Sequence, residues 1–342
     1  MSNRKLSIPV LARERRSSPS LSMGIKAHHA TAQIVSPDGV IVKESEAHNL
    51  VLDQGLDYIP MTFFFTTVAD KFNYCAVGEG VESVDEEDTG LIGETARVAS
   101  TSRAGGYSTT EGKWNQTYMF QFAPNEVEHK NLTACIFSWS ATAGQNAFSK
   151  VVFSETLTIP TGFYLRITYA VEITWPWRWD HTISIPGWGT HSGRIRIPGE
   201  GRDETGRRTR NIIGIFDSVV CGAGTSNNNW RTNAYGSDAA YNEGYGVPLS
   251  AAVGSSMVPI RKPYMPGSFE RSIDLEIPLT TTYANNSRSL TFCFGSTRGP
   301  GNGFVDYWGA LTFTLHQGEP SMSKDNEHIL TLENFKISWG RA

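Results

Sequence analysis

The fold is decided by Phe163–Trp179, which reads FYLRITYAVEITWPWRW. Every odd-numbered position of this stretch is apolar, and most even-numbered positions are polar. The apolar positions are Phe163, Leu165, Ile167, Tyr169, Val171, Ile173, Trp175, Trp177 and Trp179. A repeat of two places them on one face of an extended strand, whereas a helix would scatter them around its circumference. The stretch therefore predicts a long antiparallel strand with one buried side.

Pro176 divides this stretch near its end. Proline has no backbone N–H to donate to a neighbouring strand, so it is tolerated mainly at edges and bends. The stretch is also much longer than a usual strand of about 5 to 6 residues. We therefore expect Trp175–Trp179 to project past the core, as an edge or after a bend at Pro176.

The composition indicates a β protein along the rest of the chain. The 342 residues include 33 Gly, 16 Pro, 17 Phe, 12 Tyr and 9 Trp, a mixture that favours strands and turns over helices. We expect an all-β fold, an antiparallel β-sandwich or jelly-roll-like arrangement with long loops. An N-terminal extended arm and a Gly/Arg-rich insertion are expected to extend this fold.

The chain divides into four expected blocks. Residues 1–28 form a basic extended arm, and residues 29–186 form the first half of a β-sandwich core. Residues 187–265 form a loop-rich insertion, because Gly, Asn, Ser and Arg dominate there. Residues 266–342 contain strands that either complete the sandwich or form a second, related β unit.

The arm carries basic residues with a single acid between them, Glu14, and little periodicity. One interpretation is a disordered tail. The other is a peptide that becomes ordered on a neighbouring subunit, for instance as an added strand at a sheet edge. The basic residues that would make this contact are Arg4, Lys5, Arg13, Arg15 and Arg16.

Three local patterns predict single elements. Ser36-Pro37-Asp38-Gly39 is a strong turn sequence and predicts a hairpin between flanking strands. Asp53 is expected to cap a short helix that runs to about Phe64. In the last strand, the apolar positions change phase at Glu333-Asn334, which predicts a β-bulge.

Net charge and cysteine spacing exclude several partners. A formal charge of −4 gives no reason to expect nucleic acid or membrane insertion, and acids dilute the arginines between Arg194 and Arg210. The longest apolar runs are far shorter than the roughly 20 residues of a membrane span, and the N-terminus has no apolar signal region. The four cysteines lack metal or redox spacing, so we expect buried thiols from a reducing compartment.

No motif predicts catalysis, a metal or a cofactor. The acidic loop Glu79–Asp88 lacks the spacing of a calcium loop, and a solvated turn is the favoured interpretation. His181 and His191 do not have the spacing of zinc ligands. The chain also lacks a nucleophile elbow, a phosphate-binding loop and a recognisable acid pair. We therefore expect no enzymatic activity and no cofactor.

The tryptophans after the opening strand form a second candidate contact surface. They are Trp175, Trp177, Trp179 and Trp188. They are either the buried face of the strand or part of a subunit interface, where Trp and Arg are enriched. A platform for sugar rings, with tyrosines downstream, is the alternative. The interface is the favoured interpretation.

Several short motifs together resemble a group of tailed-bacteriophage structural proteins. Asn49-Leu-Val-x-Asp53-x-Gly55-Leu56 is similar to the opening motif of that group. Ala76-Val-Gly78-Glu-Gly80, followed by Asp88-Thr-x-Leu91-x-x-Glu94-x-x-Arg97, resembles its central run. Phe148–Tyr169 resembles its paired closing strands, and Ile337-Ser-Trp-Gly-Arg341 its C-terminal ending. The basic arm and residues 187–254 lie outside the resemblance.

This resemblance implies a virion component of the tail or appendage type that assembles as a homo-oligomer. It assigns no catalytic residue. Its motif residues are expected to be turn and cap residues that fix the fold: Asp53, Gly55, Gly78, Gly80, Asp88 and Glu94.

We therefore expect a structural protein of a bacteriophage virion, made in the host cytoplasm and associated with the tail, baseplate or neck. Its expected partners are copies of itself and other virion proteins. The alternative is a receptor- or glycan-binding module that recognises a glycan on the host surface. A hydrolase of surface polysaccharide has the least support.

Overall fold

A computed structural model describes residues 20–61, 72–108, 112–176, 178–185, 189–197, 201–202, 208–209, 233–237, 255–256, 258–277, 289–298, 305–320 and 330–342. Strands dominate these residues, and the expected all-β class is confirmed. Short helical turns are found at α1 (Asp53–Tyr58), η1 (Ile59–Met61) and α3 (Pro124–Val127). No helix in this part of the chain is long and apolar enough to cross a membrane.

The larger of two sheets runs in the order β17-β18-β21-β1-β10-β7-β6-β5-β8-β9-β4, with β2 and β3 attached beside β10. Its strands are β1 (Ser20–Ala27), β2 (Ala30–Val35), β3 (Ile41–Ala47), β4 (Asn49–Val51), β5 (Tyr74–Gly78), β6 (Glu94–Ser108), β7 (Lys113–Phe122), β8 (Asn131–Ser138), β9 (Ala147–Thr158), β10 (Tyr164–Thr174), β17 (Val258–Arg261), β18 (Glu270–Ile277) and β21 (Leu330–Arg341). The sheet is curled. It is also mixed, because β1 pairs antiparallel with β10 and parallel with β21.

The smaller sheet runs in the order β11-β12-β20-β19-β15-β16, with β13 and β14 beside β20. Its strands are β11 (Arg178–Ile185), β12 (Gly189–Arg196), β13 (Gly201–Arg202), β14 (Arg208–Thr209), β15 (Asn233–Ser237), β16 (Ser255–Ser256), β19 (Ser289–Arg298) and β20 (Val305–Leu315). Strands after residue 266 join both sheets. The jelly-roll-like arrangement stays a prediction, as does the four-block division apart from the boundary of the arm.

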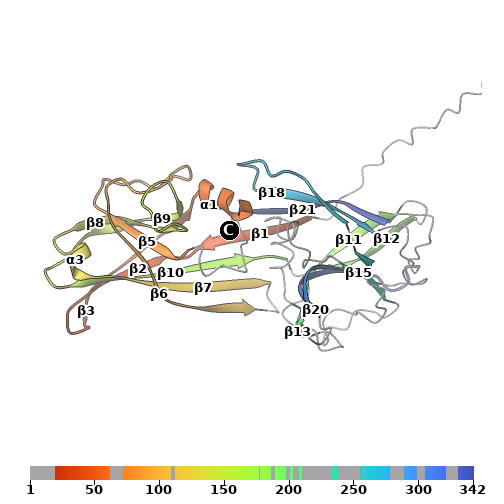
Figure 1. The fold of residues 1–342 in the computed structure, drawn as a ribbon, viewed down its shortest axis with the longest axis horizontal. Coiled ribbons are helices and arrows are strands. Elements are labelled where there is room, and N and C mark those ends of the chain that lie inside the picture. The colour runs from red at the N-terminus through yellow and green to blue at the C-terminus, as the bar shows by residue number, and fades with distance from the viewer. Residues whose placement is uncertain are drawn as a thin grey trace, which may run out of the picture.

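The opening stretch forms two strands in different sheets. β10 has the expected alternation of buried and half-buried residues, and it pairs with β1, β2 and β7. It ends at Thr174, before Pro176, and the chain enters the smaller sheet with β11 (Figure 1). A single strand over the whole stretch is wrong, because the chain leaves β10 before Pro176. The choice between an edge and a bend at Pro176 stays a prediction.

The segment Ser20–Ala27 corrects the expected boundary of the arm. It forms β1, which lies between β10 and β21, and its side chains Leu21, Met23 and Ile25 are fully buried. These three residues alternate, but the surrounding basic residues masked the pattern. The last residues of the predicted arm are therefore a core strand.

Two of the local predictions are confirmed. Ser36–Gly39 joins β2 to β3, and Gly39 has a φ of 81°, which favours glycine. In β21, Phe335 pairs with Ile273, and the next pair joins Leu332 to Leu275. Three residues of β21 thus span the same step as two of β18, which is the expected bulge at Glu333-Asn334.

The predicted cap of the first helix is wrong. The residue at the N-cap position is Leu52, and no side chain caps this helix. Asp53 is the first helical residue, and its carboxylate instead accepts a hydrogen bond from Arg341. Residues 62–71 lie outside the described residues, so the expected end near Phe64 is not tested.

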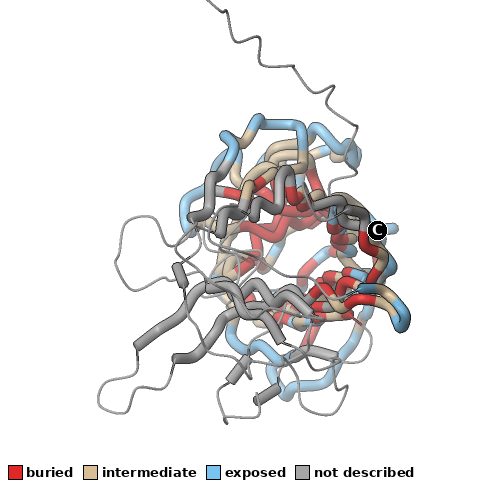
Figure 2. The backbone as a smooth tube through the Cα atoms, turned by 90° about the vertical axis from the view of Figure 1, so that its right-hand side faces the viewer, coloured by how far each residue is buried: buried red, intermediate tan, exposed pale blue. Residues whose placement is uncertain are grey.

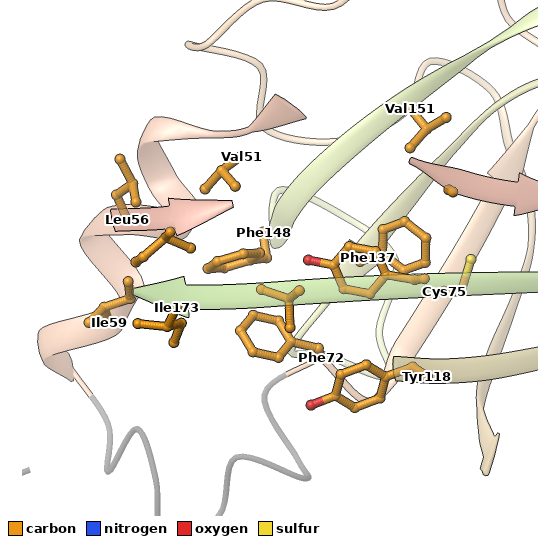
Figure 3. Packing of buried hydrophobic residues seen from close by; sticks show 14 of the residues in the cluster. Val51, Leu56, Ile59, Phe72, Cys75, Tyr118, Phe137, Phe148, Val151 and Ile173 are labelled. Carbon is orange, nitrogen blue, oxygen red and sulfur yellow. The ribbon is translucent and has the colours of Figure 1, made fainter. Parts of the chain in front are cut away.

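One apolar cluster spans both sheets. It joins Leu165 and Ile173 of β10 to Ile195 of β12 and Phe313 of β20. Seen along the long axis, the buried residues lie toward the inside of the curled sheet (Figure 2). Figure 3 shows Leu56 and Ile59 beside Ile173, next to an aromatic group that includes Phe72, Phe137, Phe148 and Tyr118. Aromatic rings packed edge to face or offset contribute beyond their buried area.

Cys75 and Cys135 are buried free thiols in this core. Burial raises the pKa of the Cys75 thiol, and a hydrogen bond with Cys135 raises it further. A thiol in such a setting is protonated and unreactive. Both residues therefore behave as small apolar side chains, as expected.

Candidate functional site

Residues 79–93, which connect β5 to β6, form the candidate site, and we call them the 79–93 loop. The loop lies over a second, smaller apolar cluster formed by Leu52, Ala76, Ile136 and Ala147. Leu91 of the loop packs against that cluster. Hydrogen bonds to two backbone carbonyls hold the loop, because Asp53 N donates to Glu86 O (2.8 Å) and the Gln54 side chain donates through Nε2 to Thr89 O (2.6 Å).

Lys150 lies beneath the loop. Its side chain is 3% exposed, and its ammonium is 2.7 Å from Glu82 Oε2 and 3.0 Å from Asp88 Oδ2. Burial lowers the pKa of Lys150, but the two carboxylates raise it more, and the net pKa is above its ordinary value. Lys150 is therefore charged, and its charge holds two turns of the loop against β9.

Arg341 holds the loop from the C-terminal strand. Its Nε donates to Val51 O (2.6 Å), and its Nη2 donates to Asp53 Oδ1 (2.5 Å). Its Nη1 lies 3.2 Å from Glu86 Oε2. One guanidinium therefore joins the start of α1, the loop and the end of β21, a use that suits its planar fork of donors.

Arg97 closes the far end of the loop. It forms a two-point pair with Glu94, through Nε to Oε1 (2.8 Å) and Nη2 to Oε2 (2.7 Å). Its Nη1 also donates to Ser140 O (2.9 Å) and Asn146 Oδ1 (3.1 Å). The Arg97 side chain is 6% exposed, and such two-point pairs are both strong and specific in geometry.

Glycine is required where the two ends of the loop meet. A Cβ on Gly80 would lie 2.4 Å from Ile92 O and 2.9 Å from Ile92 Cβ. Gly93 has a φ of 68°, a left-handed conformation that side chains disfavour. Thr133 Oγ1 donates to Gly80 O (2.6 Å) from the neighbouring strand. The loop ends are therefore fixed by close backbone contact.

The outer side of the loop is apolar. Val81 is 96% exposed, Ile92 64% and Val84 37%. Ile92 lies against Gly80, and its N–H donates to Glu82 Oε1 (2.5 Å). Glu82 therefore points inward to Lys150, whereas Val81 and Ile92 face solvent.

The expectation of a solvated turn in the acidic loop is wrong for Glu82 and Asp88. The Glu82 side chain has no exposed surface, and Asp88 contacts Lys150. Both carboxylates form ion pairs with Lys150 of the same protein. Within the described ranges, no group of three or more His, Cys, Asp or Glu is placed to hold a metal ion.

Further hydrogen bonds hold helix α1, which is itself bonded to the loop through Asp53. Tyr264 Oη and Gly267 N (2.8 Å) both donate to Asp57 Oδ1, and Trp339 Nε1 donates to Leu56 O (3.0 Å). Burial and the hydrogen bond to Asp57 raise the pKa of Tyr264. Helix α1 is therefore held by the segment before β18 and by β21.

The structure places few of the predicted contact residues. Trp175 is 8% exposed, and its side chain belongs to the main core. Its backbone N–H donates to Gly112 O (2.8 Å). Its place in the core corrects the assignment of Trp175 to a partner-facing surface, because its side chain packs inside its own chain. Trp179 lies on β11, where it pairs with Ile195. The remaining contact residues, Arg4, Lys5, Arg13, Arg15, Arg16, Trp177 and Trp188, lie outside the described residues.

Sequence reasoning missed Lys150, Arg341 as an anchor, and the exposed Val81 and Ile92. One signal was present, because Lys150 interrupts the apolar run Phe148–Phe153 and a lysine in a buried strand requires a partner. Comparison of the chain with protein-family models, curated proteins and solved structures found no match. The case for a function therefore depends on the chain's own motifs and geometry.

Proposed function

We propose that the chain is a structural component of a bacteriophage virion, associated with the tail, baseplate or neck. It is made in the host cytoplasm and assembles with copies of itself and with other virion proteins. The proposal assigns it no catalytic residue and no cofactor. In this proposal, residues 1–19 make contacts between subunits.

One observation carries this proposal: the motifs that resemble phage structural proteins meet at one place. Asp53 of the opening motif is bonded to Arg341 of the C-terminal ending. Asp88 and Glu94 of the central run are bonded to Lys150 and Arg97. Gly80 lies in close contact with Ile92. Motif residues far apart in the chain thus support a single loop, which favours a shared structural role for them.

The way these polar residues are used also favours a structural role. Glu82, Asp88 and Glu94 are each engaged by a basic side chain. A catalytic acid or base needs access to a reacting group and a free proton site. The ion pairs of these carboxylates instead hold the loop in place. The loop exposes apolar side chains to solvent, as an assembly surface does.

The receptor- or glycan-binding alternative has no comparable support. It relied on the aromatic residues from Trp175 onward, and Trp175 is buried in the core. We therefore argue only the virion proposal further.

The test is incorporation of the chain into particles. Phage particles are purified from a host in which the gene supplies either the full chain or the chain without residues 1–19. The deletion ends at residue 19 because Leu21, Met23 and Ile25 are core residues. Quantitative mass spectrometry of the particles measures the amount of chain, and gold-labelled antibody with electron microscopy shows its position.

We expect the full chain in purified particles, at the tail, baseplate or neck. The shortened chain is expected to fold but to be depleted at least tenfold from particles, because its subunit contact is lost. Particles that lack the full chain would overturn the proposal. Equal incorporation of both forms would remove the role assigned to residues 1–19.

A further inference from the structure

The 79–93 loop combines exposed apolar side chains with unbalanced negative charge. Four of its six acids, Glu79, Glu82, Glu86 and Asp88, pair with basic side chains from elsewhere in the chain. Within the described residues Asp85 and Glu87 form no ion pair, so the unbalanced charge is theirs. Val81, Val84 and Ile92 face solvent, and Asp85 and Glu87 are exposed beside them. A segment that binds this surface must therefore supply apolar side chains together with positive charge.

The loop is held in this conformation before any partner arrives. Lys150, Arg341 and the backbone contacts of Gly80 fix it from below. A fixed loop loses little conformational entropy on binding, so more of its contact energy appears as affinity. The exposed valine and isoleucine side chains would gain free energy when a partner removes them from water.

The chain itself contains a segment of the required chemistry. Residues 1–19 carry five basic residues and one acid. Leu6, Ile8 and Val10 alternate between the two groups of basic residues, so an extended segment would place them on one face. The segment therefore has the positive charge that the 79–93 loop lacks. It also has apolar side chains that can cover those of the loop.

We propose that the 79–93 loop of one copy binds residues 1–19 of a neighbouring copy. The apolar residues of the segment cover Val81, Val84 and Ile92, and its arginines face Asp85 and Glu87. This inference rests on the proposed function, in which the chain assembles with itself, and it names the surface that receives the segment.

The position of β1 shows where residues 1–19 join the described fold. Ile25 pairs with Arg341, which contacts the loop, whereas Ser20 pairs with Lys336 at the other end of β1. In Figure 1, β1 starts on the side of the smaller sheet and runs toward β2. Ser20 therefore lies about 16 Å along the strand from the anchor of the loop, a distance that an extended segment of this length can span. The choice of a neighbouring copy rests on the proposed self-assembly, and the isotope labels of the first experiment test it.

The first experiment is site-specific crosslinking in the full chain. A photoreactive benzoylphenylalanine replaces Val81, which is 96% exposed, or Val40 as the control, which is 59% exposed and lies in the β2–β3 hairpin. Copies with natural isotopes and copies labelled with nitrogen-15 are mixed, assembled and irradiated. Mass spectrometry of the digested product identifies both the crosslinked peptide and the copy that supplied it.

We expect position 81 to crosslink to peptides from residues 1–19 that carry the other isotope label, at least tenfold more than position 40 does. Crosslinks that join only equal labels in mixed samples would show that the segment binds its own chain, and would overturn the proposal. Crosslinks from position 81 only to other regions or other virion proteins would overturn it as well.

The second experiment measures self-association directly. In full chains, Val81→Asp with Ile92→Asp adds charge to an acidic surface and removes apolar contact. Sedimentation is expected to show association at least about tenfold weaker, the effect of losing roughly 1.4 kcal/mol. Val40→Asp is expected to leave association unchanged. Circular dichroism checks that all variants are folded.

The outcomes separate this inference from the proposed function. If the loop variants associate and enter particles normally while the full chain is a virion protein, only the docking inference fails. If the full chain is absent from particles, the proposed function fails whatever the crosslinks show. Glu87→Arg alone is expected to weaken association. Recovery of association when Glu87→Arg is combined with Arg15→Glu would support the predicted charge contact.

Discussion

Lys150 is the residue on which the shape of the 79–93 loop depends most. It is a buried charge between two carboxylates, one of them also buried. Removal of one member of such a group leaves an uncompensated charge inside the protein, which costs much more than the net contribution of the intact group. The loop and β9 are therefore coupled through one side chain.

We predict that Lys150→Met destabilises the protein by about 3 to 5 kcal/mol, because Glu82 is left buried without its counter-charge. The free energy of unfolding is measured by chemical denaturation. Lys43→Met is the matched control, because Lys43 pairs with Glu155 at 3.0 Å on the surface. That change is expected to cost at most about 1 kcal/mol.

A further variant checks the reason for the loss. Lys150→Met combined with Glu82→Gln and Asp88→Asn removes the whole charged group and is expected to recover part of the lost stability. A cost below about 1 kcal/mol for Lys150→Met alone would show that the ion pairs contribute no more than surface pairs do.

At the scale of elements, helix α1 and strand β9 are packed against each other without space between them. Gly55 of α1 lies over the backbone of Phe148, the second residue of β9. The helix can approach this closely only because position 55 has no side chain.

We predict that Gly55→Ala destabilises the protein by about 1 to 3 kcal/mol. A Cβ at this position would lie 2.3 Å from Phe148 O, and this clash outweighs the gain of about 1 kcal/mol that alanine brings to a helix. Gly340→Ala on β21 is the control, because no heavy atom lies within 4 Å of its Cβ. Thermal unfolding of both variants tests the comparison, and equal midpoints would contradict the packing argument.

The alternation of apolar residues was sufficient to predict β10 and the bulge in β21, and the turn sequence Ser36–Gly39 predicted the hairpin of β2 and β3. Alternation gave no information on pairing, since β10 pairs with β1, β2 and β7. It failed for β1, whose three alternating residues Leu21, Met23 and Ile25 follow a basic segment of little periodicity. The partners of Lys150 and Arg341 were also beyond prediction, because they depend on how the loop folds across the sheet rather than on any local pattern.

At the scale of the whole molecule, β1 begins at Ser20 and is a central strand of the larger sheet. The proposed contact segment, residues 1–19, directly precedes it in sequence. Deletions that end on either side of β1 are therefore expected to have different effects.

We predict that removal of residues 1–19 leaves the unfolding midpoint unchanged, whereas removal of residues 1–27 abolishes cooperative unfolding. The longer deletion removes Leu21, Met23 and Ile25 from the core. Loss of each such side chain costs about 2 to 5 kcal/mol, and together they approach the total stability of a typical protein. Calorimetry tests this, and a cooperative transition in the longer deletion would show that β1 is dispensable.

The parallel pairing of β1 with β21 also sets an order on biosynthesis. The ribosome makes β1 (Ser20–Ala27) long before β21 (Leu330–Arg341), so β1 lacks its second neighbour while the residues between them are made. Contacts so distant in sequence form slowly, and exposed strand edges promote aggregation in the interval. The nascent chain therefore completes its larger sheet only after β21 has been made, and a chaperone that shields β1 until then would raise its yield.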